Sequence, residues 1–227
     1  SDLVVTIPPQ EKIERRLKTD KTAAQIALPF LYDAERDQPL RKVFLRIDPP
    51  DLADNTDDLS RLQREVARTL GIDDVTTDLP VVRTMARTLR DADWEVTAVL
   101  EAPGLRNTRA HILAVEPGDT RRNLWGAAVD IGTTTVTVYL VDLHTGQVRE
   151  IAADYNGQIT RGEDVISRII YAGKEGGLQD LSNLVSATIN RLLAQACQRQ
   201  GIDPSSVYRM SIVGNSTMIH LLLGLPP

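Results

Sequence analysis

The first half of the chain alternates between strand-like and helix-like spacing of its hydrophobic residues. An apolar run at residues 43–47 predicts a strand that two prolines terminate. Residues 57–70 carry apolar side chains three and four positions apart, as on one helix face. Residues 80–89 repeat this spacing after a proline suited to a first helical turn. Two further strands are predicted at residues 94–100 and 110–115. The pattern therefore predicts a small β-α-α-β-β unit.

The second half of the chain is richer in apolar strands. Two apolar runs on either side of a short polar turn predict a strand-turn-strand over residues 127–142, and residues 148–153 predict a third strand. The elements that follow are a helix, a longer helix, a strand and a last helix, at residues 164–171, 178–199, 208–213 and from 217 onward. Strands and helices that alternate in this way indicate a mixed α/β fold.

Residues 1–40 show no sustained hydrophobic period apart from a short strand-like run at residues 3–7. We therefore predict three parts: a linker over residues 1–40, a small α+β middle domain over residues 41–120, and the first part of a larger α/β domain over residues 124–227. The sequence begins with Ser1 rather than Met and stops directly after an apolar helical stretch. We interpret it as a fragment of a longer protein.

Composition and charge narrow the possible partners. The net charge of -5 and the pI near 5.3 provide no positive field for nucleic acid or an anionic membrane surface. No stretch reaches the roughly 20 apolar residues of a membrane span. One cysteine, Cys197, excludes an intrachain disulfide framework and a four-thiolate iron-sulfur site within this chain. We expect a cytoplasmic protein that binds neither nucleic acid nor a membrane.

A polar turn in the second half carries the candidate chemistry. Asp130 follows an apolar run, and a carboxylate at a strand end can hold Mg²⁺ through its waters. Gly132 has no Cβ, so a polyphosphate can approach its backbone and meet the N–H groups that follow. Thr133 and Thr134 add hydroxyl donors, and Thr135 completes the turn. A metal-binding acid and a turn of donors make up half of a phosphoryl-transfer site.

A plain β-hairpin is the alternative for this turn, because Gly and Thr are common where two strands connect. The position of Asp130 argues against that alternative. A carboxylate at the end of an apolar strand is costly to bury without a cation or hydrogen-bond donors. The turn is therefore a candidate phosphate site with Asp130 as its catalytic and metal-binding residue.

A second candidate segment follows the predicted strand at residues 208–213. Gly214, Asn215 and Ser216 stand between that strand and a helix, where a glycine, polar side chains and a helix N-terminus can jointly receive an anion. An ordinary helix cap formed by Asn215 or Ser216 explains the same residues equally well.

Two further residues have unremarkable interpretations. Cys197 has no paired base or second thiol in the sequence, so we expect it to be unreactive. His220 lies on an apolar helix face without clustered ligands, and we expect a core or interface histidine rather than a metal ligand.

The motifs of the second half resemble a known family. The turn DIGTTT at residues 130–135 is similar to the first phosphate motif of the superfamily of actin, sugar kinases and heat-shock chaperone ATPases. Three downstream motifs narrow the resemblance to the reductive activators of corrinoid proteins: NGQ at 156–158, GEDVISRI at 162–169 and VGNSTMIHLLLG at 213–224. The resemblance extends to DNTDDLSRL at 54–62 and WEVT at 94–97, and so spans nearly the whole chain. One departure is Gly157, where the family usually has proline.

The resemblance implies an α/β architecture in which a small α+β module precedes the first half of an actin-like, ribonuclease H-like ATPase lobe. It implies an ATPase that couples ATP and Mg²⁺ to the reduction of a corrinoid protein from Co(II) to Co(I). The electrons would come from a 2Fe–2S ferredoxin domain that this chain lacks, and the partners would be a corrinoid protein of a methyltransferase system and a second copy of the chain. Asp130 would hold Mg²⁺, and Gly132 to Thr135 would bind the phosphates.

Two other functions remain open at this stage. One is a small-molecule kinase of the same superfamily, and the other is a non-catalytic oligomerisation module with a degenerate turn. Because the chain contains one wall of the ATP site, we expect little ATP hydrolysis by this chain alone.

Overall fold

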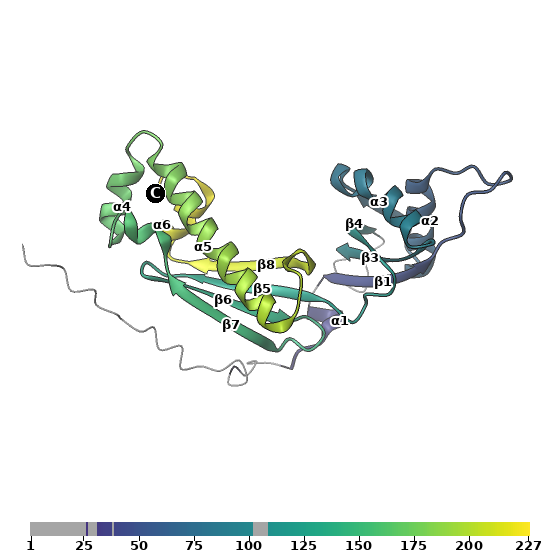
Figure 1. Cartoon of the computed structure of the whole chain (residues 1–227), viewed down its shortest axis with the longest axis horizontal. Coiled ribbons are helices and arrows are strands. Elements are labelled where there is room, and N and C mark those ends of the chain that lie inside the picture. Colours follow the sequence, from purple (N-terminus) through teal and green to yellow (C-terminus); the bar gives the residue numbers. More distant parts are fainter. Residues whose placement is uncertain (1–25, 27–30, 38, 102–108) are drawn as a thin grey trace, which may run out of the picture.

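The computed structural model describes residues 26, 31–37, 39–101 and 109–227. These residues form two four-stranded sheets, each with helices packed on one face (Figure 1). We call residues 40–117 the first unit and residues 125–223 the second unit. The strand predicted at residues 3–7 lies outside the described residues.

The sheet of the first unit has the strand order β1-β3-β4-β2. The strands β1, β3 and β4 pair in antiparallel fashion, and β2 runs parallel to β4. Two helices, α2 and α3, pack on this sheet, and a single-turn helix, α1, precedes it. The elements are α1 Ala34–Asp37, β1 Leu40–Arg46, α2 Asp58–Leu70, β2 Asp74–Thr77, α3 Leu79–Asp91, β3 Glu95–Glu101 and β4 Arg109–Pro117.

The predicted β-α-α-β-β order of this unit is wrong in one element. The strand β2 stands between the two helices, so the order is β-α-β-α-β-β. It spans four residues, DVTT, at the edge of the sheet, and three of them are polar. A strand so short has no alternation of apolar and polar residues that the sequence could reveal.

Local signals in the sequence account for both helices of the first unit. The carboxylate of Asp57 caps α2 by accepting from the N–H of Ser60 at 2.9 Å, and Gly71 ends the helix with φ at 65°. Only glycine adopts that left-handed conformation without strain. A proline occupies the first turn of α3. Along the predicted apolar faces Leu62, Val66 and Leu89 are fully buried, whereas Leu59 and Leu70 are partly buried against them.

The sheet of the second unit has the order β7-β6-β5-β8. The strands β5, β6 and β7 are antiparallel neighbours, and β8 runs parallel to β5. The mixed α/β fold class predicted from the sequence is confirmed. The elements are β5 Trp125–Ile131, β6 Thr135–Asp142, β7 Val148–Tyr155, η2 Gly157–Thr160, α4 Val165–Ala172, α5 Gly177–Gln200, η3 Pro204–Ser206, β8 Val207–Gly214 and α6 Ser216–Leu223.

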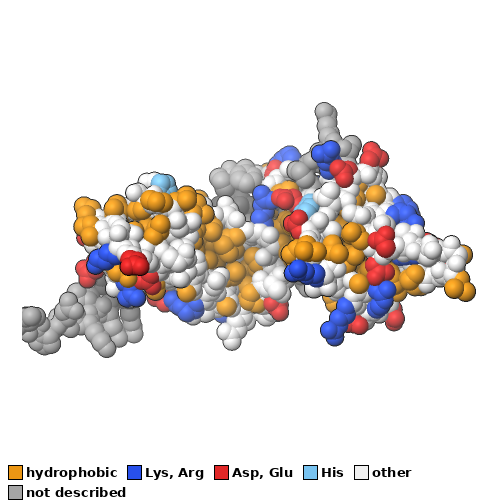
Figure 2. Space-filling model, turned by 90° about the horizontal axis from the view of Figure 1, so that it is seen from above, with side chains coloured by type: hydrophobic (Ala, Val, Ile, Leu, Met, Phe, Trp, Pro, Cys, Tyr) orange, Lys and Arg blue, Asp and Glu red, His pale blue; other side chains and the backbone are white. Residues whose placement is uncertain are grey.

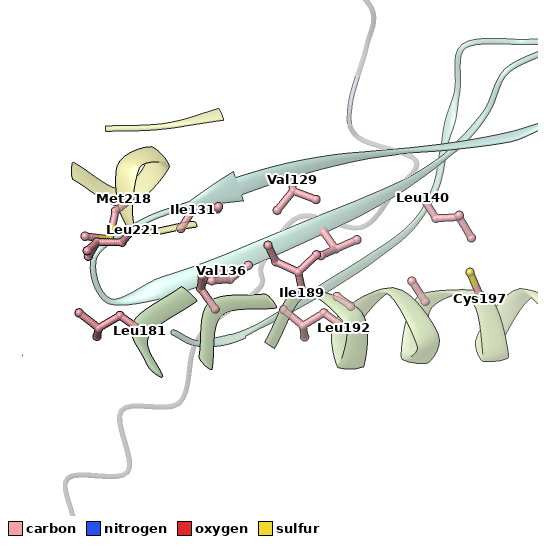
Figure 3. Packing of buried hydrophobic residues seen from close by; sticks show 14 residues of the cluster. Val129, Ile131, Val136, Leu140, Leu181, Ile189, Leu192, Cys197, Met218 and Leu221 are labelled. Atoms are coloured by element: carbon pink, nitrogen blue, oxygen red, sulfur yellow. The ribbon is translucent and has the colours of Figure 1, made fainter. Parts of the chain in front are cut away.

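The long helix α5 lies across one face of this sheet and forms its core (Figure 3). Alternate strand residues such as Val129, Ile131 and Val136 point at the helix, as the period of two in a strand requires. Leu181 and Leu192 face them from α5. Burying such side chains contributes about 1.5 to 3 kcal/mol each, so this layer fixes the strand ends that carry the candidate site.

The two units meet around the carboxylate of Glu116. It accepts from the hydroxyl of Tyr208 at 2.6 Å and from Lys42 Nζ at 2.6 Å. Burial alone would raise the pKa of Glu116, but hydrogen bonds from Lys42, Thr120 and Tyr208 outweigh it and lower the pKa. Burial also raises the pKa of Tyr208. A polar network thus connects β1 and β4 of the first unit with β8 of the second.

The surface seen from above shows basic and acidic side chains interspersed over the first unit (Figure 2). Neither sign of charge forms a continuous field on this face. Within the described part of the chain, no helix combines the length and the apolar character that a membrane span needs.

Candidate functional site

Both candidate segments lie at the same edge of the second sheet. The strands β5 and β8 are parallel neighbours, with Ile131 opposite Gly214 in the register. The turn after β5 and the turn after β8 therefore leave the sheet side by side. Residues 82 positions apart meet here, since the amide Nδ2 of Asn215 is 3.5 Å from the hydroxyl of Thr133. The structure brings the two predicted segments together.

A short backbone hydrogen bond closes the turn between β5 and β6. The N–H of Gly132 donates to the carbonyl of Thr135 at 2.8 Å. A Cβ on Gly132 would lie 2.8 Å from that carbonyl oxygen, closer than a real Cβ contact allows. Glycine is therefore required here for the close approach of the Thr135 carbonyl, and the approach of a polyphosphate, which the sequence suggested, stays a prediction.

Three successive carbonyl groups of this turn are held by buried neighbours. Asn156 Nδ2 donates to the carbonyl of Gly132 at 3.0 Å, and the Asn156 N–H donates to that of Thr134 at 2.9 Å. Arg168 Nη2 donates to the carbonyl of Thr133 at 2.6 Å. In a trans peptide the C=O of one residue and the N–H of the next point in opposite directions, and no described peptide is cis.

It follows that the N–H groups of Thr133, Thr134 and Thr135 point away from Asn156 and Arg168. A run of backbone N–H groups directed to one side makes a concave donor surface of the kind that receives phosphate oxygens. The exposed hydroxyl residue Thr134 stands at the same turn. The turn thus presents these backbone N–H groups on the side away from Asn156 and Arg168.

The residues that hold the turn were not among the sequence-predicted site residues. Asn156 and Arg168 are both fully buried. A possible ion pair between Arg168 and Asp164, one helical turn apart, is not what the structure shows. Asp164 instead caps α4 by accepting from the Ser167 N–H at 2.8 Å, and Arg168 points inward. Both residues lie in motifs that carry the family resemblance, at 156–158 and 162–169. The position of a residue in such a motif does not reveal which way its side chain points.

Asp130 is exposed, so the argument that its burial would be costly is wrong. The register places it beside Thr137 of β6 and Val213 of β8, on the face of the sheet opposite the core residues Val129 and Ile131. No described residue forms an ion pair with it. A single open carboxylate next to a phosphate-sized donor surface suits Mg²⁺, which keeps several waters and takes one or two carboxylates together with phosphate oxygens.

The structure confirms the helix cap considered for the second segment, and the anion-binding role of this segment stays a prediction. Asn215 is the N-cap of α6, and its Oδ1 accepts from the N–H of Met218 at 3.0 Å. Its Nδ2 faces Thr133. Ser216 is exposed at the first position of α6. A Cβ on Gly214 would lie 2.9 Å from the carbonyl oxygen of Ile131, so this glycine permits the close packing of the two strand ends.

An open cavity of about 570 Å³ adjoins the turn on the side of Thr134. Its lining also includes Tyr155 and Glu163, an aromatic ring and a carboxylate that the sequence did not single out as site residues. Gly157, the departure from the family pattern, lines it too. Its N–H donates to Thr188 at 3.2 Å, a bond that a proline could not make.

Two further expectations have different outcomes. Burial raises the pKa of the Cys197 thiol, in accord with an unreactive side chain. His220 is exposed, so a position in the core is wrong, while the interface alternative stays a prediction; its Nδ1 lies 3.0 Å from the carbonyl oxygen of Pro226.

The fold is a mixed α/β fold in which two strand-end turns converge beside a fully buried arginine. Two family models match it in succession: the one described as RACo linker region matches residues 31–122, and the one described as RACo middle region matches residues 125–227. Together they match most of the chain. The chain therefore belongs to the RACo family of corrinoid reductive activators.

Individual relatives agree with this assignment. The corrinoid activation enzyme RamQ of Eubacterium limosum is 38% identical over 115 residues, which are 50% of this chain and 19% of RamQ. A solved structure described as a reductive activator for corrinoid, iron-sulfur protein superposes with a TM-score of 0.67 at 34% identity, and the match covers 85% of this chain and 30% of that one. The chain thus spans less than a third of the length of either relative.

Proposed function

We propose that the turn at residues 132–135 binds the phosphates of ATP. The observation that carries this proposal is the restraint of three successive carbonyls by Asn156 and Arg168, which directs the N–H groups of Thr133, Thr134 and Thr135 to one side. Gly214, Asn215 and Ser216 form the neighbouring wall, through the contact between Asn215 and Thr133.

In this proposal Asp130 holds Mg²⁺. The metal neutralises phosphate charge and helps to position the transferred group, which is most of what catalysis of phosphoryl transfer requires. The residues of this chain that act on it are the exposed carboxylate of Asp130 and the phosphate-binding N–H groups beside it. The chain supplies one wall of the site, so it should hydrolyse ATP poorly by itself.

The function we propose for the whole protein is ATP-dependent reductive activation of a corrinoid protein. One electron would enter the inactive Co(II) corrinoid and produce Co(I), the form that accepts a methyl group. The names of the relatives support this substrate class. The family resemblance implies that the electron would come from a 2Fe–2S ferredoxin domain outside this chain, whose single cysteine, Cys197, cannot hold a cluster. Such low-potential chemistry belongs in the reducing cytoplasm.

The test uses the complete protein, a chemical reductant and a candidate corrinoid protein, with the cobalt state followed by absorption spectroscopy. We expect Co(I) to accumulate when ATP and Mg²⁺ are present and not when either is omitted. Asp130→Asn should abolish the ATP-dependent accumulation of Co(I) while leaving the fold intact, since Asp130 makes no ion pair among the described residues. Equal accumulation of Co(I) without ATP would contradict the proposal.

The same protein separates this function from the kinase alternative. A small-molecule kinase would transfer phosphate from ATP to a sugar or a similar hydroxyl compound with no change at cobalt. A non-catalytic module would show no ATP binding by calorimetry.

We also propose that the protein forms a homodimer, with the first unit as the contact region. Sedimentation equilibrium of the complete protein and of a variant lacking residues 40–117 tests this proposal.

A further inference from the structure

Arg168 is a fully buried cation directly behind the candidate phosphate turn. All three of its guanidinium nitrogens donate to acceptors that carry no charge. Nε reaches the carbonyl of Gly162 at 2.9 Å, and Nη2 reaches that of Thr133 at 2.6 Å. Nη1 lies 3.2 Å from Gln158 Oε1 and 3.3 Å from the thioether sulfur of Met218.

No carboxylate lies within ion-pair distance of Arg168 among the described residues. Burial lowers the pKa of Arg168, and Asp164 acts weakly against this effect. Asp164 is itself exposed and engaged in capping α4. An arginine remains charged at any ordinary pH, so the protein holds a positive charge in its interior without a direct counter-ion. Such a charge is costly unless something else compensates it.

We propose that Arg168 is the counter-charge for the phosphates bound at the turn, and that it acts through the peptide group of Thr133 without touching the ligand. Its Nη2 orients that peptide and its charge lies on the side of the turn opposite to the donor N–H groups. A polyphosphate bound on the outer side of the turn supplies the negative charge that the interior around Arg168 lacks. The inference rests on the proposed phosphate binding and assigns a charge-specific role to a residue behind it.

This role differs from that of a neutral brace. If Arg168 only held the turn in shape, its removal would weaken every nucleoside ligand that fits the site. If its charge matters, the loss should grow with the number of phosphates and fall with salt, because salt screens the interaction. Adenosine, which has no phosphate, should bind almost as before.

The experiment measures binding of ATP, ADP and adenosine by calorimetry, with Mg²⁺, to the complete protein and three variants. Arg168→Gln removes the charge and keeps a hydrogen-bond donor, and Arg168→Lys keeps the charge. Arg161→Gln is the matched control, since Arg161 is an exposed arginine of the same segment whose side chain pairs with Asp180 and not with a carbonyl of the turn. Thermal unfolding of each variant checks that it folds.

We expect Arg168→Gln to weaken ATP binding at least about tenfold, ADP less, and adenosine by no more than about twofold. Arg168→Lys should recover most of the preference for ATP, and the control should behave as the wild type. Should Arg168→Gln fail to fold, the Lys variant and the salt dependence of the wild type still test the charge. Equal losses for ATP and adenosine, or no loss for ATP, would overturn this inference alone. A wild type that binds no ATP would overturn the proposed function as well.

Discussion

Each unit of the molecule buries an arginine, and the two arginines differ in what surrounds them. Arg61 in the first unit is 2% exposed, and its Nη1 donates to the carboxylate of Asp54 at 2.8 Å. Arg168 in the second unit is 0% exposed and contacts neutral acceptors only. The same side chain therefore forms half of an ion pair in one unit and is a charge without a direct ion-pair partner in the other.

This difference indicates a division of roles. The first unit pairs the charge of its buried arginine with Asp54, although Arg61 Nε has no hydrogen-bond partner among the described residues, and such internal pairing is expected of a structural or docking module. In the second unit the charge of Arg168 lies behind a turn whose backbone N–H groups face outward. This arrangement is expected of a site that binds an anion. Both units have a well-packed core, so the difference lies in the polar groups and not in the quality of packing.

The largest expected effects come from the two cores. Leu62 in the first unit and Leu192 in the second are both fully buried. Changing either to Ala should lower the free energy of unfolding by about 2 to 5 kcal/mol through lost burial and a residual cavity. Chemical denaturation measures both losses. Only Leu192→Ala should also weaken ATP binding by the complete protein, and an equal loss in Leu62→Ala would break the separation of roles.

A smaller effect is expected at Gly132. A Cβ there would meet the carbonyl oxygen of Thr135, so Gly132→Ala must shift the turn, at a cost of about 1 to 3 kcal/mol in unfolding free energy. ATP binding should fall at least about tenfold, since the donor N–H groups move with the turn. Gly173→Ala is the control, because its added Cβ would meet nothing closer than 3.5 Å. Unchanged ATP affinity in Gly132→Ala would argue against the turn as the phosphate site.

The cap of α6 offers a sharper separation of shape and chemistry. Asn215→Ala should destabilise the second unit by about 1 kcal/mol, because the N–H of Met218 loses its acceptor. Asn215→Ser keeps a capping oxygen but lacks the Nδ2 that faces Thr133. We expect the serine variant to recover the stability and to retain a weaker affinity for ATP than the wild type. Full recovery of both would reduce Asn215 to a simple cap.

The smallest effect is a dependence of the unfolding free energy on pH that Asp54, the ion-pair partner of Arg61, should contribute. Hydrogen bonds from Thr56, with smaller contributions from Arg64 and Arg61, hold the pKa of Asp54 below its usual range. A lowered folded-state pKa contributes stability that is present above the unfolded pKa of about 3.9 and is lost as the pH falls below it. Urea unfolding of the wild type and of Asp54→Asn at pH 5 and pH 3 measures this. The variant should lose less stability between the two pH values, and an identical loss would contradict the assignment.

Much of the fold followed from patterns of the sequence. Helix α2 was predictable because the period, the cap at Asp57 and Gly71 all agree. Strand β2 was not, because its four residues show no alternation and are held by pairing with β4, 35 positions away in sequence. Local preference decides the first case and a long-range contact the second.

The candidate site divides in the same way. The sequence predicted that Gly132 leaves room for a phosphate, and the structure gives another reason for glycine, since a Cβ would meet the carbonyl oxygen of Thr135. The carboxylate of Asp130 was expected to be buried at a free-energy cost. It is instead exposed, because the alternation of side chains along β5 turns it away from the core. Arg168 could not be predicted as a support of the turn, because its reach to Thr133 depends on how α4 packs.

Hydrogen exchange of the complete protein with and without Mg²⁺ and ATP tests the central claim most directly. When Mg²⁺ and ATP are added, the account predicts slower amide exchange in peptides that contain Thr133, Thr134 and Thr135. It predicts a smaller slowing of exchange around Asn215 and no change in α2 of the first unit. ATP binding that leaves the turn as exchangeable as before, with protection elsewhere only, would contradict it.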